Sequence, residues 1–161
     1  MLLLIIFIIL AFCFGFVILF GPPYLPTLKP QIESAFELLD LKPGQTIIEL
    51  GSGDGKVLIY AAKKGFKVIG YELNPLLYFL SLIRTYKYRK DVKIYCANFW
   101  QVDWPKSDAI FTFLLNRQML KLDKRINSNA HKPIKLASFA FKIPGKKIHK
   151  EKNGVFLYEY K

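Results

Sequence analysis

The stretch Ile47-Ile48-Glu49-Leu50-Gly51-Ser52-Gly53-Asp54-Gly55 decides the fold, because an apolar strand containing an acid gives way to three alternating glycines. A second strand, at 67–72, ends in Glu72, twenty-one residues after Gly51. Glycines let the backbone approach a ligand closely, and a distal carboxylate can hold ribose hydroxyls. The two strands therefore predict a nucleoside pocket at the carboxyl edge of a parallel sheet.

The glycine spacing excludes two common nucleotide sites. A dinucleotide fingerprint needs glycine at position 56, where this chain has Lys56. A P-loop needs four residues between its glycines, whereas Gly51 and Gly55 leave three. The remaining pattern, acid-x-G-x-G-x-G, resembles the first motif of class I methyltransferases, and this resemblance implies an S-adenosylmethionine site. The sulfonium and ammonium of that ligand suit the acidic loop formed by Glu49 and Asp54.

A glycine-rich turn can also serve only to let a helix pack closely on a sheet. The cofactor interpretation is favoured because Glu72 ends a strand and Asn74-Pro75 then begins a helix. After the third strand, the oxygen of Asn98 can accept from an adenine amino group, and Phe99 or Trp100 can cover the ring. An ordinary turn with aromatic core residues remains the alternative there. The predicted cofactor residues are Glu49, Gly51, Ser52, Gly53, Gly55, Glu72, Asn98 and Phe99.

The first twenty residues, Met1 to Phe20, carry no charge and are rich in Leu, Ile and Phe. As a helix they would span about 30 Å, enough to cross a bilayer. A cleaved signal peptide is disfavoured, because no basic residue precedes the apolar run and no small-x-small cleavage site follows before Gly21-Pro22-Pro23. We expect residues 1–20 to be a transmembrane anchor and the membrane bilayer to be a partner of this segment.

All 24 Lys and Arg and all 12 Asp and Glu follow this segment, so the net charge of +12 belongs to the rest of the chain. The positive-inside tendency then predicts a single-pass protein with its domain in the cytoplasm. A basic domain would also be attracted to an anionic leaflet. Only four of the basic residues are Arg, which disfavours a nucleic-acid partner. The two Cys and two His form no metal-ligand pattern.

The chain divides into the anchor, a Pro-rich neck at 21–30 and one domain at 31–161. The domain should begin with a helix at 31–41. The expected strands are 46–51, 67–72, 92–98, 109–115, 134–141, 146–152 and 155–160, and the expected further helices are 55–64, 75–88 and 117–126. Asn153-Gly154 is a strong hairpin signal.

This order predicts an α/β fold, a mostly parallel Rossmann-like sheet with an antiparallel C-terminal hairpin. The segment 101–108 is too short for a regular crossover helix, and Pro144-Gly145 leaves no room for a helix before the hairpin. We therefore expect a compact variant in which these connections are abbreviated.

The motifs also carry a narrower resemblance. Glu49-Leu50-Gly51-Ser52-Gly53-Asp54-Gly55-Lys56, Gly70-Tyr71-Glu72-Leu73-Asn74-Pro75 and Asn98-Phe99-Trp100 resemble those of class I methyltransferases, and with the anchor they look like small membrane-associated protein-lysine methyltransferases. These are relatives of the enzymes that modify the adenine nucleotide translocase and the ATP synthase c-subunit. The resemblance implies S-adenosyl-L-methionine as cofactor and a membrane-protein substrate. Asn98 departs from the usual Asp, and Leu115-Asn116 departs from the expected small residue and Pro.

Methyl transfer to a neutral lysine amine depends on alignment more than on a covalent nucleophile. No residue stands out as a general base, and Asp54, Trp100 and Asn116 are weak candidates for orienting the amine. Two further functions stay open: a membrane-tethered methyltransferase for lipids or small molecules, and a non-catalytic cofactor-binding scaffold.

Overall fold

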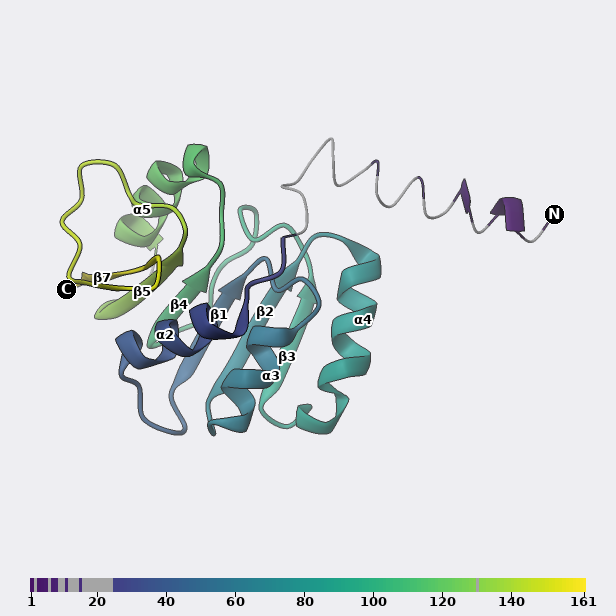
Figure 1. Ribbon diagram of the computed structural model, residues 1–161, viewed down its shortest axis with the longest axis horizontal. Helices are drawn as coiled ribbons and strands as arrows, with labels where there is room; N and C mark the ends of the chain where they lie inside the picture. Colours follow the sequence, from purple (N-terminus) through teal and green to yellow (C-terminus); the bar gives the residue numbers. More distant parts are fainter. Residues whose placement is uncertain (2, 6, 9–10, 12–14, 16–24, 130) are drawn as a thin grey trace.

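One sheet of seven strands forms the centre of the protein (Figure 1). The computed structural model describes residues 1, 3–5, 7–8, 11, 15, 25–129 and 131–161. The strands are β1 (Thr46–Leu50), β2 (Lys67–Glu72), β3 (Val92–Cys96), β4 (Ala109–Thr112), β5 (Ile134–Phe139), β6 (Lys150–Lys152) and β7 (Val155–Tyr160). Their order across the sheet is β3-β2-β1-β4-β5-β7-β6. Strands β1 to β5 are parallel to one another, and β7 runs antiparallel to both β5 and β6.

Helices cover both faces of this sheet. The helical elements are α2 (Lys29–Leu39), α3 (Lys56–Lys63), α4 (Pro75–Thr85), the 3-10 turn η1 (Tyr86–Tyr88) and α5 (Asn116–Asn129). Helices α2 and α3 bury their apolar residues in one core, and α4 packs beside α3 against β2 and β3 (Figure 1). Helix α5 contributes to the separate core on the opposite face. The arrangement is a three-layer α/β/α domain.

Successive side chains of a strand point to opposite faces, and the two cores divide β1 accordingly. Ile47 lies in the core with α2 and α3, while Ile48 lies in the core with α5. Both are fully buried. A strand covered on both sides needs apolar residues at consecutive positions, which explains the unbroken apolar run that precedes the glycines.

The predicted fold class is confirmed for the sheet and its antiparallel C-terminal strands, with corrections to several element ends. Strand β3 ends at Cys96 rather than at 98, and β4 ends at Thr112 rather than at 115. The ladder between β1 and β4 ends with the pair Leu50 and Thr112, because β1 turns away into its glycine loop there. The apolar residues after Thr112 therefore continue the sequence pattern without continuing the strand.

The abbreviated connections are also confirmed. No helix occurs in 97–108, between β3 and β4, or in 140–149, between β5 and β6. Strand β6 starts at Lys150 rather than at 146, and α5 is longer than predicted at both ends. Helix α2 starts at Lys29, inside the segment predicted as neck, and ends at Leu39 rather than at 41.

The predicted transmembrane helix at 1–20 lies mostly outside the described residues. Residues 3–5, 7–8, 11 and 15 have helical backbone. In the part of the chain that the structure describes, no helix has both the length and the apolar character needed to span a bilayer.

Candidate cofactor-binding site

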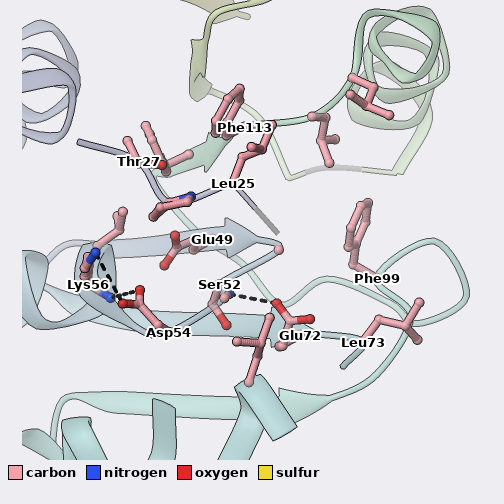
Figure 2. Close-up of a pocket in the computed structure, with 18 of the residues that line it drawn as sticks. Leu25, Thr27, Glu49, Ser52, Asp54, Lys56, Glu72, Leu73, Phe99 and Phe113 are labelled. Atoms are coloured by element: carbon pink, nitrogen blue, oxygen red, sulfur yellow. Dashed lines mark hydrogen bonds and ion pairs between the residues drawn. The ribbon is translucent and has the colours of Figure 1, made fainter. Parts of the chain in front are cut away.

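A pocket opens at the carboxyl ends of β1, β2 and β4, where the strands give way to loops (Figure 2). Ligands of open α/β sheets bind at this edge, where the strand order reverses. The lining includes seven of the eight predicted cofactor residues, namely Glu49, Gly51, Ser52, Gly53, Glu72, Asn98 and Phe99. Two of the three catalytic candidates, Asp54 and Trp100, also line it.

The glycine turn after β1 is fixed to β2 by its backbone. The amides of Gly51 and Ser52 both donate to the carbonyl of Tyr71, at 3.0 and 2.9 Å. Gly51 has φ +85°, and a Cβ added there would meet no atom within 4 Å. The turn therefore needs glycine for its backbone conformation and leaves open space on the pocket side, as close approach of a ligand requires.

Gly55 has a different position from the other predicted glycines. It does not line the pocket. A Cβ at Gly55 would lie 2.5 Å from Ser81 Oγ and 3.3 Å from Thr85 Cγ2, both on α4. The structure thus gives this glycine a packing role, the alternative that the sequence left open for the whole turn.

Glu72 connects the two motifs through its carboxylate. Oε2 accepts from the amide of Gly53 at 2.7 Å, and Oε1 accepts from the amide of Asn74 at 2.7 Å. Each carboxylate oxygen retains a lone pair for another donor, such as a sugar hydroxyl. Burial raises the pKa of Glu72, and the backbone hydrogen bonds from Asn74, Gly53 and Leu73 oppose that rise.

Glu49 is only 4% exposed and lies on the pocket side of β1 (Figure 2). Its Oε2 has no hydrogen-bond partner among the described residues. Burial raises the pKa of Glu49 well above its usual range, and the negative charges of Glu72 and Asp54 add to the rise. A buried carboxylate without a partner is costly, so a cationic ligand or a bound proton would stabilise it.

Asp54 turns its carboxylate toward basic side chains at the edge of the pocket. Oδ2 pairs with Arg84 of α4 and lies 3.5 Å from Nζ of Lys56. Arg84 also donates to the backbone carbonyl of Asp54 at 3.0 Å. Because these cations already engage its carboxylate, Asp54 is placed to hold the glycine turn against α4 rather than to accept a proton from a substrate.

The loop after β3 brings Asn98, Phe99 and Trp100 to the pocket. Asn98 Oδ1 accepts from the amide of Trp100 at 3.0 Å, so the oxygen predicted to face adenine also stabilises its own turn. An amide oxygen has two lone pairs and can accept a second hydrogen bond. The rings of Phe99 and Trp100 lie 4.8 Å apart, and Phe99 faces the pocket (Figure 2).

Several lining residues were not predicted. Residues 25–27 lie across the pocket, although sequence reasoning treated them as part of a spacer (Figure 2). Phe113 and Gln118 line it from the segment after β4, and Oε1 of Gln118 is buried without a partner among the described residues. No local pattern marks these positions, since only the folded chain brings them together. Asn116, the third catalytic candidate, begins α5 and does not line the pocket.

Comparison with known families matches residues 49–150 to the ANTKMT methyltransferase domain. A human lysine N-methyltransferase of the ATP synthase c-subunit is 32% identical over 124 residues, covering 76% of this chain and 53% of that protein. The chain thus spans about half the length of that relative. A protein-lysine N-methyltransferase from Saccharolobus islandicus is 26% identical, covering 84% of this chain and 92% of the relative.

Among solved structures, an RNA methyltransferase from Salinibacter ruber in complex with S-adenosyl-L-homocysteine aligns with a TM-score of 0.77. It is 21% identical and covers 84% of this chain and 92% of that one, a likeness that concerns the fold. The resemblance drawn from the motifs of strands β1 to β3 is confirmed by the family match. This chain belongs to the ANTKMT methyltransferase family.

Proposed function

We propose that this protein is an S-adenosylmethionine-dependent protein-lysine N-methyltransferase that acts on a membrane-associated protein. Two lines of support come from the comparisons. The family match spans residues 49–150, and two relatives are named as lysine N-methyltransferases. The observation that carries the proposal comes from the pocket itself.

That observation is the pair of buried acids, Glu49 and Glu72, which are 4% and 8% exposed. Neither forms an ion pair with any described residue, although the chain has a net charge of +12. A phosphate-bearing ligand would be repelled by this pocket, whereas a ligand with a sulfonium and an ammonium would relieve the repulsion between the acids. The charge of the pocket is therefore matched to S-adenosylmethionine.

Each part of the site then has a defined task. Glu72 would hold the ribose hydroxyls with the lone pairs left free by Gly53 and Asn74. The glycine turn would let the ligand approach the backbone closely, and Phe99 would cover the adenine ring. S-adenosylmethionine, when bound, supplies an electrophilic methyl group on sulfur. The residues of the chain bind, orient and exclude water, which can account for much of such a transfer.

The acceptor amine must reach the pocket in its neutral form. The remaining lining includes the aromatic ring of Phe113 and the buried Oε1 of Gln118, which has no partner among the described residues. An apolar lining disfavours the charged amine, and an amide oxygen can accept a hydrogen bond from it. We assign Phe113 and Gln118 to binding of the acceptor amine. Trp100 also lines the pocket and is the catalytic candidate that keeps a place in this assignment.

We further propose that residues 1–20 anchor the protein in a membrane with the domain on the cytoplasmic side. The support is the uncharged apolar run of Met1 to Phe20 and the basic remainder of the chain. Two relatives are named for membrane-protein substrates, the ATP synthase c-subunit and the adenine nucleotide translocase. Confinement to one surface raises the effective concentration of such a substrate without new contacts.

The experiment incubates the purified full-length protein with tritiated S-adenosylmethionine and membranes from a strain that lacks the protein. Glu72→Ala should abolish labelling of a protein band, because the variant loses the proposed ribose ligand. Glu33→Ala is the control, since Glu33 is half-exposed on α2 and does not line the pocket. Mapping the label to lysine would complete the assignment.

Other outcomes would support the other two functions. Label in the lipid extract would identify a lipid or small-molecule methyltransferase. Cofactor binding by calorimetry with no transfer to any fraction would identify a binding scaffold. Either result would overturn the proposed lysine methylation.

A further inference from the structure

Helix α4 differs from an ordinary surface helix, because its fully buried residues are polar and many of its exposed residues are apolar. Its buried residues are Ser81 and Thr85. Its large apolar side chains point outward, with exposed fractions of 60% for Phe79, 76% for Ile83 and 66% for the adjoining Tyr86. Leu80 and Leu82 are exposed as well. Single exposed apolar residues are normal, but a contiguous group of this kind marks an interaction surface.

The packing of the glycine turn explains why the inner face is small. Gly55 approaches α4 so closely that its missing Cβ would contact Ser81 and Thr85. Larger residues at 81 and 85 would displace the turn and, with it, the Arg84 contact to Asp54. Positions 81 and 85 therefore have no room for large apolar side chains, and the apolar contact of α4 with the core comes from Tyr78. This contact does not require the outer face to be apolar. The outer residues need a partner outside the described domain.

The charges around this face indicate which partner fits. No Asp or Glu occurs between Leu73 and Lys90. Lys87, Arg89 and Lys90 follow the apolar stripe and are exposed. The guanidinium of Arg89 lies 4.6 Å from the ring centre of Tyr86, so a cation and an amphipathic ring close the stripe at that end. An apolar stripe bordered by cations complements a surface with an apolar interior and anionic head groups.

We propose that the outer face of α4, defined by Phe79, Leu80, Leu82, Ile83 and Tyr86, lies against an anionic phospholipid bilayer. The inference rests on the proposed membrane association and deepens it by placing a second contact on the folded domain. Phe79 and Ile83 enter the boundary between head groups and acyl chains. Lys87, Arg89 and Lys90 meet the phosphates, with their alkyl stems along the apolar surface.

The position of α4 relative to the pocket supports this orientation. Leu77, near the start of α4, lines the same pocket as Leu25, the first described residue after the predicted anchor. A chain that leaves a membrane before Leu25 therefore enters the domain at the pocket that the start of α4 also lines. With α4 flat on the bilayer, the pocket that its first turn lines stays close to substrates at the membrane surface.

A depth measurement on the full-length chain tests this contact directly. A nitrobenzoxadiazole label is placed at Ile83→Cys in a background of Cys13→Ser and Cys96→Ser. The matched control carries the label at Leu120→Cys, because Leu120 is also exposed, at 51%, but lies on α5. Both proteins are mixed with vesicles of phosphatidylcholine and phosphatidylserine that have brominated acyl chains, and flotation reports vesicle binding separately.

We expect several-fold stronger quenching at position 83 than at position 120. Replacing Lys87, Arg89 and Lys90 with Gln should reduce the quenching at 83 toward its value in phosphatidylcholine alone, while Lys121→Gln and Lys124→Gln on α5 should leave it unchanged. An unchanged signal in the triple variant would overturn the anionic specificity.

Three results would overturn the proposal, and they differ in whether they also exclude the proposed anchor. Flotation with equal quenching at both positions would leave the anchor in place but exclude α4 as a contact. No flotation would exclude both. A label at 83 that is shielded before vesicles are added would assign the face to a second copy or to the residues before Leu25. None of these readouts depends on methyl transfer, so the enzyme activity can be judged independently.

Discussion

Helices α4 and α5 flank opposite faces of the same sheet and differ in what they bury. Helix α5 places Met119, Leu122 and Ile126 in its core, each fully buried, and turns Lys121 and Lys124 outward. Helix α4 fully buries only Ser81 and Thr85 and turns Phe79, Leu80, Leu82 and Ile83 outward. The difference shows that α5 is held by apolar packing, whereas α4 is held at Ser81 and Thr85 by close contact with the glycine turn.

The largest effect is expected when one apolar residue is replaced in each helix. Leu122→Ala should lower the free energy of unfolding by about 2–5 kcal/mol, because it leaves a cavity in a closed core. Ile83→Ala should change the same quantity by less than about 0.5 kcal/mol, because the side chain is 76% exposed. Urea unfolding in detergent measures both. Similar losses in the two variants would contradict the stated difference in packing between α4 and α5.

A second test examines the close packing on the α4 side. Gly55→Ala should cost about 1–3 kcal/mol, because the new Cβ meets Ser81 Oγ at 2.5 Å and the residue must keep φ +79°. Gly44→Ala is the control for backbone strain, since Gly44 has φ +89° and open space around it. The excess of the Gly55 loss over the Gly44 loss measures the contact with α4. An equal loss at both glycines would exclude that contact.

A third test uses the unpaired acid beside the turn. Burial and neighbouring acids raise the pKa of Glu49, so the folded protein holds this proton more tightly than the unfolded chain does. Stability contributed by the protonated form is complete below the ordinary glutamate value and is lost as pH rises through the raised pKa.

Glu49→Gln removes this pH dependence and should gain on the order of 1 kcal/mol relative to wild type at neutral pH, without ligand. The measurement is the urea midpoint as a function of pH, with Glu33→Gln as control. Added S-adenosylmethionine should stabilise the wild type more than it stabilises Glu49→Gln. Parallel pH curves for wild type and Glu49→Gln would contradict the assigned burial cost.

The smallest expected effect concerns the link between α4 and the turn. Arg84→Ala removes the pair with Asp54, and it should cost no more than about 1 kcal/mol because a third of the Arg84 side chain is exposed. Cofactor affinity should fall by a few-fold as the turn loosens. Isothermal titration measures this loss, with Arg89→Ala as control. A loss of affinity as large in Arg89→Ala would show that the Asp54 pair is not its cause.

Local patterns predicted the sheet well where the apolar run of a strand ends at a clear turn signal. Strand β2 has the predicted bounds, and the hairpin between β6 and β7 turns at Asn153 and Gly154, both with positive φ. Strand β4 was overestimated because the sequence stays apolar beyond the point where β1 ends, and β3 was overestimated because its ladder with β2 ends at Cys96. Strand ends depend on the partner, which periodicity does not contain.

The pocket was predicted from its motifs, and its remaining walls were not. Glu49 and Glu72 lie at the ends of neighbouring strands, so topology alone brings them to one edge. Residues 25–27, Phe113 and Gln118 reach the pocket through tertiary packing of segments without a motif. The exposed face of α4 was also missed, because 75–86 is apolar on nearly every side and such a sequence does not reveal which side packs.

The placement of Leu25 at the pocket limits how far the pocket can lie from the membrane. If Phe20 ends a membrane-spanning segment, the five residue steps from Phe20 to Leu25 extend at most ~18 Å, whatever path they take. Leu25, and the part of the pocket that it lines, would then lie within that distance of the end of the segment. The length of this connection would then select substrate lysines by their distance from the membrane, before any side-chain recognition takes place.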